Sequence, residues 1–202
     1  MRMLNTVLLP LSVGLFCICL STTARADTIT FTGSRDFSGG QGGAPSPSRC
    51  GPTPPFVLVT HPTGTGASNL GSFASTESHC VNLGTGNLFN GAFTYDFGGG
   101  NTFFGTYVGT VIGTLPPPIG TVLDVTFTYT ITGGTGLFVD ATGNLVGTGI
   151  ATITSTGTTS HIDIRGSVNT VPEPATMLLL GTGLAGVCAA IRKRRKSLQR
   201  SQ

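Results

Sequence analysis

The chain has 202 residues, of which 31 are glycine and only 9% are charged, and its formal net charge is +3. That length suits one domain with targeting segments attached. The positive charge belongs to the C-terminal end: between residues 27 and 170, three arginines stand against seven acidic side chains, a net charge of about −4. We therefore expect no binding to nucleic acid.

Residues 1–26 have the pattern of a secretory signal peptide. One basic residue, Arg2, precedes an apolar stretch over residues 6–20, and the small residues Ala24 and Ala26 follow it. The apolar stretch is too short for a stable membrane span. We expect cleavage before Asp27 and export of the segment that follows.

The exported segment, residues 27–170, contains two cysteines. Residues 39–55 are rich in glycine and proline, which predicts a long loop or insertion that carries Cys50. Cys50 and Cys80 form an isolated pair in an oxidising compartment. A disulfide between them would close a loop of about thirty residues and stabilise the fold by roughly 3–4 kcal/mol.

A metal site is the alternative use of this region. It would combine Cys80 with His79 and His61, but the sequence offers no second pair of closely spaced ligands. We favour the disulfide and expect neither a metal nor a cofactor.

Alternating side chains predict β-strands from about residue 90 onward. One strand places four apolar residues on one face and four threonines on the other: Val125, Phe127, Tyr129 and Ile131 against Thr126, Thr128, Thr130 and Thr132. Residues 98–101, 133–136 and 142–144 have the glycine and asparagine of tight turns. The pattern predicts an all-β fold, an antiparallel β-barrel of about eight strands, with a β-sandwich as the alternative. The expected core consists of Phe93, Tyr95, Phe97, Phe104, Val125, Phe127, Tyr129, Ile131, Phe138, Ile153 and Ile164.

Part of this region resembles a known family. Residues 129–138 read Tyr-Thr-Ile-Thr-Gly-Gly-Thr-Gly-Leu-Phe, and Ala141, Thr142 and Gly143 follow. The stretch is similar to the glycine turn and following strand of dirigent proteins and of barrels like allene oxide cyclase. The resemblance implies a barrel whose cavity is lined by polar and aromatic residues, and no catalytic residue is carried over from it.

The remaining polar residues form no catalytic constellation. The histidines are His61, His79 and His161, and the aspartates of the strands and turns are Asp96, Asp124, Asp140 and Asp163. Their spacing indicates no carboxylate pair of the kind that glycosidases need. Asp140 reads as a turn former, and His161 and Asp163 are expected to point to solvent or to a polar lumen. We therefore expect no enzyme.

Residues 171–202 form a tail of three parts. The motif Val171-Pro172-Glu173-Pro174-Ala175 precedes an apolar segment over residues 176–191, and the basic run Arg192, Lys193, Arg194, Arg195 and Lys196 follows. The apolar segment is expected to form one transmembrane helix, with the basic run on the cytoplasmic side. The tail resembles the PEP-CTERM sorting signal of exopolysaccharide-producing Gram-negative bacteria.

That resemblance implies recognition by exosortase, a membrane protease or transpeptidase that cuts at or near Pro172-Glu173-Pro174. The two prolines would hold the cleavage segment extended. The resemblance favours an exported protein that is transiently anchored in the inner membrane, then processed to the cell surface or released, in association with exopolysaccharide or biofilm. The alternative function is binding of a small molecule or carbohydrate, or cyclase-like chemistry, in a barrel lumen.

Overall fold

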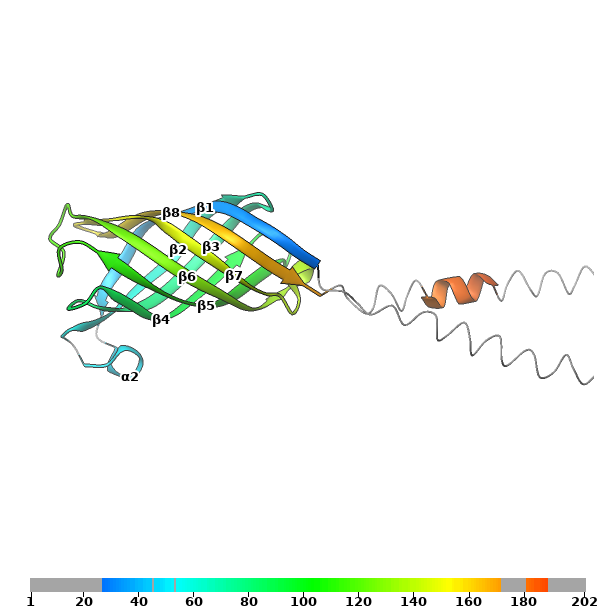
Figure 1. Cartoon of the computed structure of the whole chain (residues 1–202), viewed down its shortest axis with the longest axis horizontal. Helices are drawn as coiled ribbons and strands as arrows, with labels where there is room; N and C mark the ends of the chain where they lie inside the picture. Colours follow the sequence, from blue (N-terminus) through cyan, green and yellow to red (C-terminus); the bar gives the residue numbers. More distant parts are fainter. Residues whose placement is uncertain (1–26, 45, 53, 172–180, 189–202) are drawn as a thin grey trace, which may run out of the picture. The chain divides into compact units, whose positions relative to one another are not determined.

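Eight antiparallel strands hydrogen-bond in sequence order around a closed ring in the described residues, because the last strand pairs with the first (Figure 1). The strands are β1 Asp27–Ala44, β2 Phe56–Ser68, β3 Gly71–Asn82, β4 Asn87–Asp96, β5 Thr102–Ile112, β6 Val122–Thr135, β7 Thr142–Thr154 and β8 Gly157–Thr170. A short helix, α2 (Pro47–Cys50), lies between β1 and β2, and a single 3-10 turn, η1 (Gly136–Phe138), follows β6. The predicted all-β antiparallel fold is confirmed, and the closed ring replaces the alternative of two stacked sheets.

This computed structural model describes residues 27–44, 46–52, 54–171 and 181–188. The predicted signal peptide and most of the predicted tail, including its basic run and all of its motif except Val171, lie outside the described residues. Residues 181–188 are helical and belong to a separate unit from the ring. Within the described part of the chain, no helix has both the length and the apolar character that a membrane span requires.

Alternation decides which side chains fill the ring. Along β6, every second residue from Leu123 to Ile131 is buried, and the intervening threonines are exposed. The predicted core is confirmed for most of its members, with Phe97 and Ile153 partly buried. Phe104 is a correction: it is 40% exposed, and Phe103 beside it is fully buried. Phe103 shares its face of β5 with the buried Tyr107, whereas the Phe104 ring covers Gly133 on the outer surface.

The predicted turn at residues 98–101 is confirmed, since it lies between β4 and β5, but the other two predicted turns and the predicted loop need correction. Residues 133–135 continue β6, so the turn between β6 and β7 lies at residues 136–141, and residues 142–144 already belong to β7. The predicted loop at residues 39–55 is shorter than expected, because β1 continues to Ala44. Glycine-rich segments read as loops in the sequence, but here neighbouring strands on both sides supply backbone hydrogen bonds.

The predicted disulfide between Cys50 and Cys80 is present, with Cα atoms 5.4 Å apart. It joins α2 to β3, on the face of β3 opposite to the inward His79. Arg49 strengthens the attachment, since its Nη2 donates to the carbonyl oxygens of Ser78 (3.1 Å) and Asn90 (2.7 Å). The α2 segment is thereby fixed to the wall formed by β3 and β4.

Candidate functional site

The interior of the ring changes character along its length. Near the end where β1 starts and β8 ends, aromatic rings fill the space, with centroids 5.2–5.8 Å apart in neighbouring pairs: Phe31 with Phe103, Phe73 with Phe97, and Phe97 with Phe138. Glycines on β2 make room for these rings, because a Cβ at Gly66 would overlap the ring of Phe73. This end is closed by side chains.

A polar layer follows the aromatic one, built on an ion pair between β1 and β3. Arg35 Nη2 lies 2.6 Å from Glu77 Oε2, and the two side chains are 2% and 1% exposed. The Arg35 guanidinium also lies 4.5 Å from the Phe37 ring centroid and 5.5 Å from that of Phe127, distances at which a cation is attracted to the face of a ring. Burial alone would lower the pKa of Arg35, but the Glu77 carboxylate raises it, so the guanidinium stays charged.

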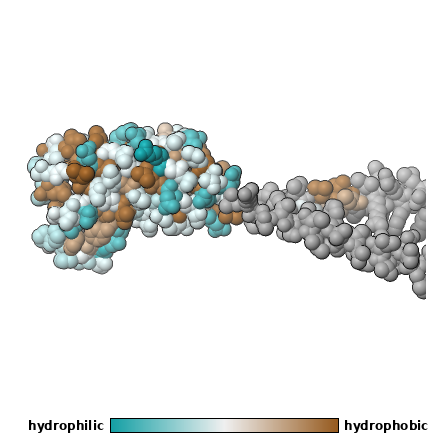
Figure 2. Space-filling view, in the orientation of Figure 1, coloured by the Kyte–Doolittle hydropathy of each residue, from teal (hydrophilic) through white to brown (hydrophobic). Residues whose placement is uncertain are grey.

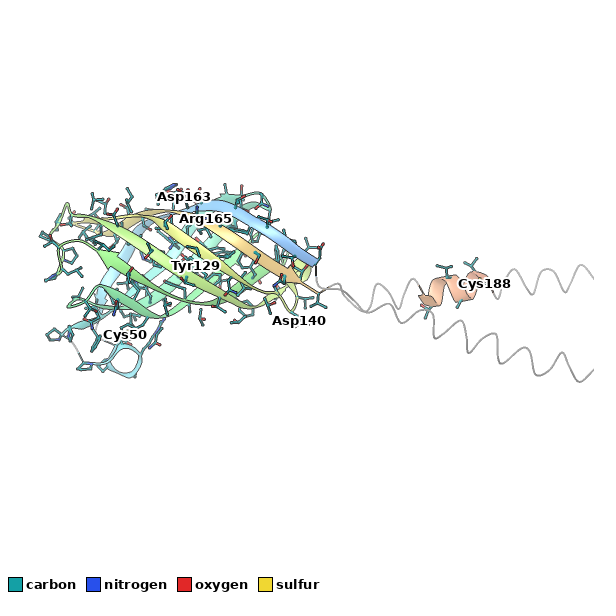
Figure 3. The ribbon with its side chains drawn as sticks, viewed as in Figure 1. Cys50, Tyr129, Asp140, Asp163, Arg165 and Cys188 are labelled. Atoms are coloured by element: carbon teal, nitrogen blue, oxygen red, sulfur yellow. A yellow bond between two sulfur atoms is a disulfide. The ribbon has the colours of Figure 1, made fainter. Side chains whose placement is uncertain are left out.

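Tyrosine hydroxyls also form hydrogen bonds with this pair. The hydroxyls of Tyr95 (3.3 Å) and Tyr129 (3.5 Å) donate to Glu77 Oε1, and Arg35 Nη2 donates to the Tyr129 oxygen at 3.1 Å. Burial raises the pKa of Glu77, an effect that Arg35 and the hydroxyls oppose. Burial also raises the pKa of both tyrosines, which therefore remain protonated donors. Tyr129, labelled in Figure 3, is fully buried.

Two histidines lie beside the ion pair. His79 Nδ1 is 2.6 Å from the hydroxyl of Tyr107, and the rings of His61 and His79 are 5.9 Å apart. Burial, with the charge of Arg35, lowers the pKa of His61 to about 4. Burial, with His61, Arg35 and Arg49, lowers the pKa of His79 to about 3. Both imidazoles are therefore neutral at physiological pH.

A cavity of about 420 Å³ occupies the end of the ring away from the aromatic layer. Its polar lining consists of Arg35, His61, His79, Thr154, Thr158 and Ser160, and the rest is mainly aliphatic, with Val59, Val81, Leu88, Leu123, Val125 and Ile153 among the lining residues. Leu115 and Pro117, from the connection between β5 and β6, also line it. The volume is that of a typical small-molecule site. Apolar residues, brown in Figure 2, gather toward the left-hand end of the ring, where this connection lies.

The residues singled out in the sequence are divided between this interior and the surface. His61 and His79 line the cavity, whereas His161 lies outside, with its Nδ1 2.7 Å from Asp36 Oδ1. The hydrogen bond that the Asp36 carboxylate accepts raises the pKa of His161. Asp163, labelled in Figure 3, is exposed, and its Oδ1 lies 3.7 Å from His161 Nε2. The structure brings none of the four predicted aspartates to the cavity: Asp96, Asp124, Asp140 and Asp163 are all exposed.

Asp140 is a turn residue, as predicted, with a positive φ of 53°. The metal alternative fails because the Cys80 sulfur is bonded to Cys50. Among the described residues, no group of three or more histidine, cysteine or acidic side chains could hold a metal ion.

Sequence reasoning missed the ion pair at the centre of the site. Arg35 and Glu77 enter the sequence predictions only through the net charge, and Ser160 and Tyr107 do not enter them. The sequence does contain an indication of this pair. Glu77 and His79 occupy every second position of one strand, alternating with Ser78 and Cys80, and Arg35 and Phe37 occupy every second position of another. Two charged residues on inward-facing positions indicate a buried pair.

Comparison with known proteins identifies one segment. Residues 170–195 match the model of the PEP-CTERM protein-sorting motif. The match includes Pro172, Glu173, Pro174 and the basic residues up to Arg195. The motif implies export, processing by exosortase and sorting to the cell surface. Neither the curated proteins nor the solved structures contain a match to the chain, so the comparisons give no support to the resemblance to dirigent proteins.

Proposed function

We propose that the chain is an exported protein which, after exosortase processing, binds a small and largely apolar molecule in the cavity of its ring at the cell surface. The observation that carries this proposal is the cavity itself. Its aliphatic walls lead to a few polar side chains at the inner end, which is the usual arrangement of a small-molecule site. A ring that served only as a scaffold would gain stability by filling this space with side chains.

Binding fits the geometry better than catalysis. Glu77, the one buried acid among the described residues, does not line the cavity. Its two oxygens are occupied by Arg35 and by tyrosine hydroxyls. It does line a second pocket of about 180 Å³, together with Thr60, Thr76 and Thr94 on β2–β4. Among the described residues, no carboxylate faces the 420 Å³ cavity. The histidines that line it have pKa values lowered to about 4 and about 3, well below the range that suits a general base near neutral pH, so we propose a non-enzymatic role.

A blocked cavity tests the proposal. Ala151 is buried and lines the cavity, so Ala151→Phe would place a ring inside it. Ile150, the adjacent residue, is 46% exposed, and Ile150→Phe is the matched control. N-phenyl-1-naphthylamine fluoresces when it enters an apolar site. We expect the mature protein and Ile150→Phe to raise its fluorescence equally and Ala151→Phe to lose at least nine-tenths of the increase. Equal signals from all three proteins would overturn the proposal.

A second candidate function is association with exopolysaccharide in a biofilm. The outer surface of β5, β6 and β7 supports it, because exposed threonines lie opposite one another across the strands: Thr110 with Thr126, and Thr126 with Thr148. The hydroxyls of Thr110 and Thr126 are 2.8 Å apart. Co-sedimentation with the host's exopolysaccharide should weaken in Thr126→Val/Thr128→Val and persist in Thr65→Val on β2. Unchanged sedimentation of the double variant would remove this candidate.

Cleavage of the C-terminal tail can be tested separately by mass spectrometry. Intact mass of the protein purified from its native host should correspond to a chain without the basic run that ends at Lys196. A mass that retains Lys196 would contradict cleavage at or near Pro172-Glu173-Pro174.

A further inference from the structure

The polar side chains at the inner end of the cavity are not all satisfied. Arg35 Nε and His61 Nδ1 are buried and have no hydrogen-bond partner among the described residues. Both residues line the cavity, and they are 2% and 6% exposed. Buried polar groups are nearly always hydrogen-bonded, so an unpartnered pair at one site requires an explanation. A ligand oxygen that reaches this end of the cavity would supply it.

The charges at this end are already balanced. The Arg35 guanidinium is paired with Glu77, and the buried imidazoles of His61 and His79 are neutral. Arg49, whose charge also lowers the pKa of His79, donates hydrogen bonds to the carbonyl oxygens of Ser78 and Asn90. A carboxylate or ammonium group on the ligand would therefore be buried without a counter-charge, which is strongly unfavourable. A neutral polar group would avoid that cost.

The size of the cavity limits the apolar part of the ligand. Phe127 and Leu123 both line the cavity on β6 and are four residues apart, which corresponds to about 13 Å along the strand. The exposed apolar residues Ile112, Ile119 and Val122 lie in or beside the β5–β6 connection at this end of the ring. An extended chain of eight to ten carbons matches this depth.

We infer that the cavity takes a neutral molecule with an apolar body and one uncharged oxygen, such as a ketone or an alcohol, whose oxygen accepts a hydrogen bond at Arg35 or His61. The inference rests on the proposed function, since it names the class of molecule that the same cavity would hold. Free fatty acids and alkylamines of similar length would be excluded by their charge.

Three probes of equal chain length separate these classes. Isothermal titration calorimetry of the mature protein at pH 7.5 would compare nonan-2-one, nonanoate and nonylammonium. We expect nonan-2-one to bind at least tenfold more tightly than either charged probe. Equal or tighter binding of nonanoate or nonylammonium would overturn the inference and leave the proposed function standing. Failure of all three, together with no fluorescence increase from N-phenyl-1-naphthylamine, would overturn both.

A variant tests the contact at the inner end. His61→Phe keeps a ring against Phe37 and removes the unpartnered nitrogen, and His161→Phe makes the same change on the outer surface. Affinity for nonan-2-one should fall about tenfold in His61→Phe and stay within twofold in His161→Phe. An unchanged affinity in His61→Phe, with circular dichroism confirming its fold, would contradict the role of His61 as the donor to the ligand oxygen. The comparison of the three probes would still decide the class of ligand.

Discussion

Replacement of Arg35 by methionine removes one half of the buried ion pair. The Glu77 side chain, which is 1% exposed, would then keep only tyrosine hydroxyls as partners, those of Tyr95 and Tyr129 among them. Leaving one charge of a buried pair without its partner costs about 3–5 kcal/mol. A typical domain is stable by only about 5–15 kcal/mol, so Arg35→Met should lose a large part of the total.

The loss can be measured by urea-induced unfolding of the mature protein, followed by near-ultraviolet circular dichroism. The double variant Arg35→Met/Glu77→Gln should be more stable than Arg35→Met, because a neutral amide needs no counter-charge. Arg165 on β8 is exposed, so Arg165→Met is the matched control and should change the free energy of unfolding by less than about 0.5 kcal/mol. If Arg35→Met cost under about 1 kcal/mol, or if the double variant were no more stable than the single one, the ion pair would not organise the polar layer.

Two further predictions concern the disulfide and acid pH. Cys50→Ala/Cys80→Ala should lower the free energy of unfolding by about 3–4 kcal/mol, measured in urea, and alkylation of either wild-type cysteine without prior reduction would contradict the bridge. In the folded protein the pKa values of His61 and His79 are lowered to about 4 and about 3, from an ordinary histidine value of 6.5. As the pH falls below 6.5, these two histidines therefore bind protons in the unfolded chain before they do so in the folded protein. Stability is therefore full above pH 6.5 and falls toward pH 4, by up to about 1.4 kcal/mol per pH unit for each histidine. Above its ordinary pKa value of 4.5, the raised pKa of Glu77 has the opposite effect on stability. Glu77 is present in both wild type and His61→Phe, so comparing their stabilities at pH 7 and pH 5 isolates the effect of the His61 imidazole. The variant should lose less stability over that interval than wild type, and an equal loss would refute the assignment.

The strands after residue 90 could be predicted because alternation there is undisturbed. Leu123 to Ile131 point inward at every second position, and the threonines between them point outward. The same period of two also explains the error at Phe104, since two adjacent phenylalanines offer two equally apolar faces to a strand prediction. Only the position of Tyr107 four residues later, on the Phe103 face, would have resolved that choice.

The site was harder to predict because its members come from distant strands. Arg35 and Glu77 are 42 residues apart, on two strands that both pair with β2. The register alone does not align them, because Arg35 lies opposite Gly66 and Glu77 lies opposite His61, so the ion pair forms between side chains inside the ring. The cavity depends on where side chains fail to fill space, which is a property of the packed ring and of no single strand. By contrast, the tail motif is local and linear, so both the sequence and the family model identify it at residues 170–195.

A crystal structure of the mature protein with 9-bromononan-2-one would test ligand binding in the cavity most directly. The bromine gives an anomalous signal that marks the far end of the chain. We expect one peak at the mouth, near Leu115 and Leu123, with the ketone oxygen within 3.5 Å of Arg35 or His61. A peak on the outer surface near Phe104 and Val108, or a cavity without bromine when the ligand is in large excess, would contradict the account.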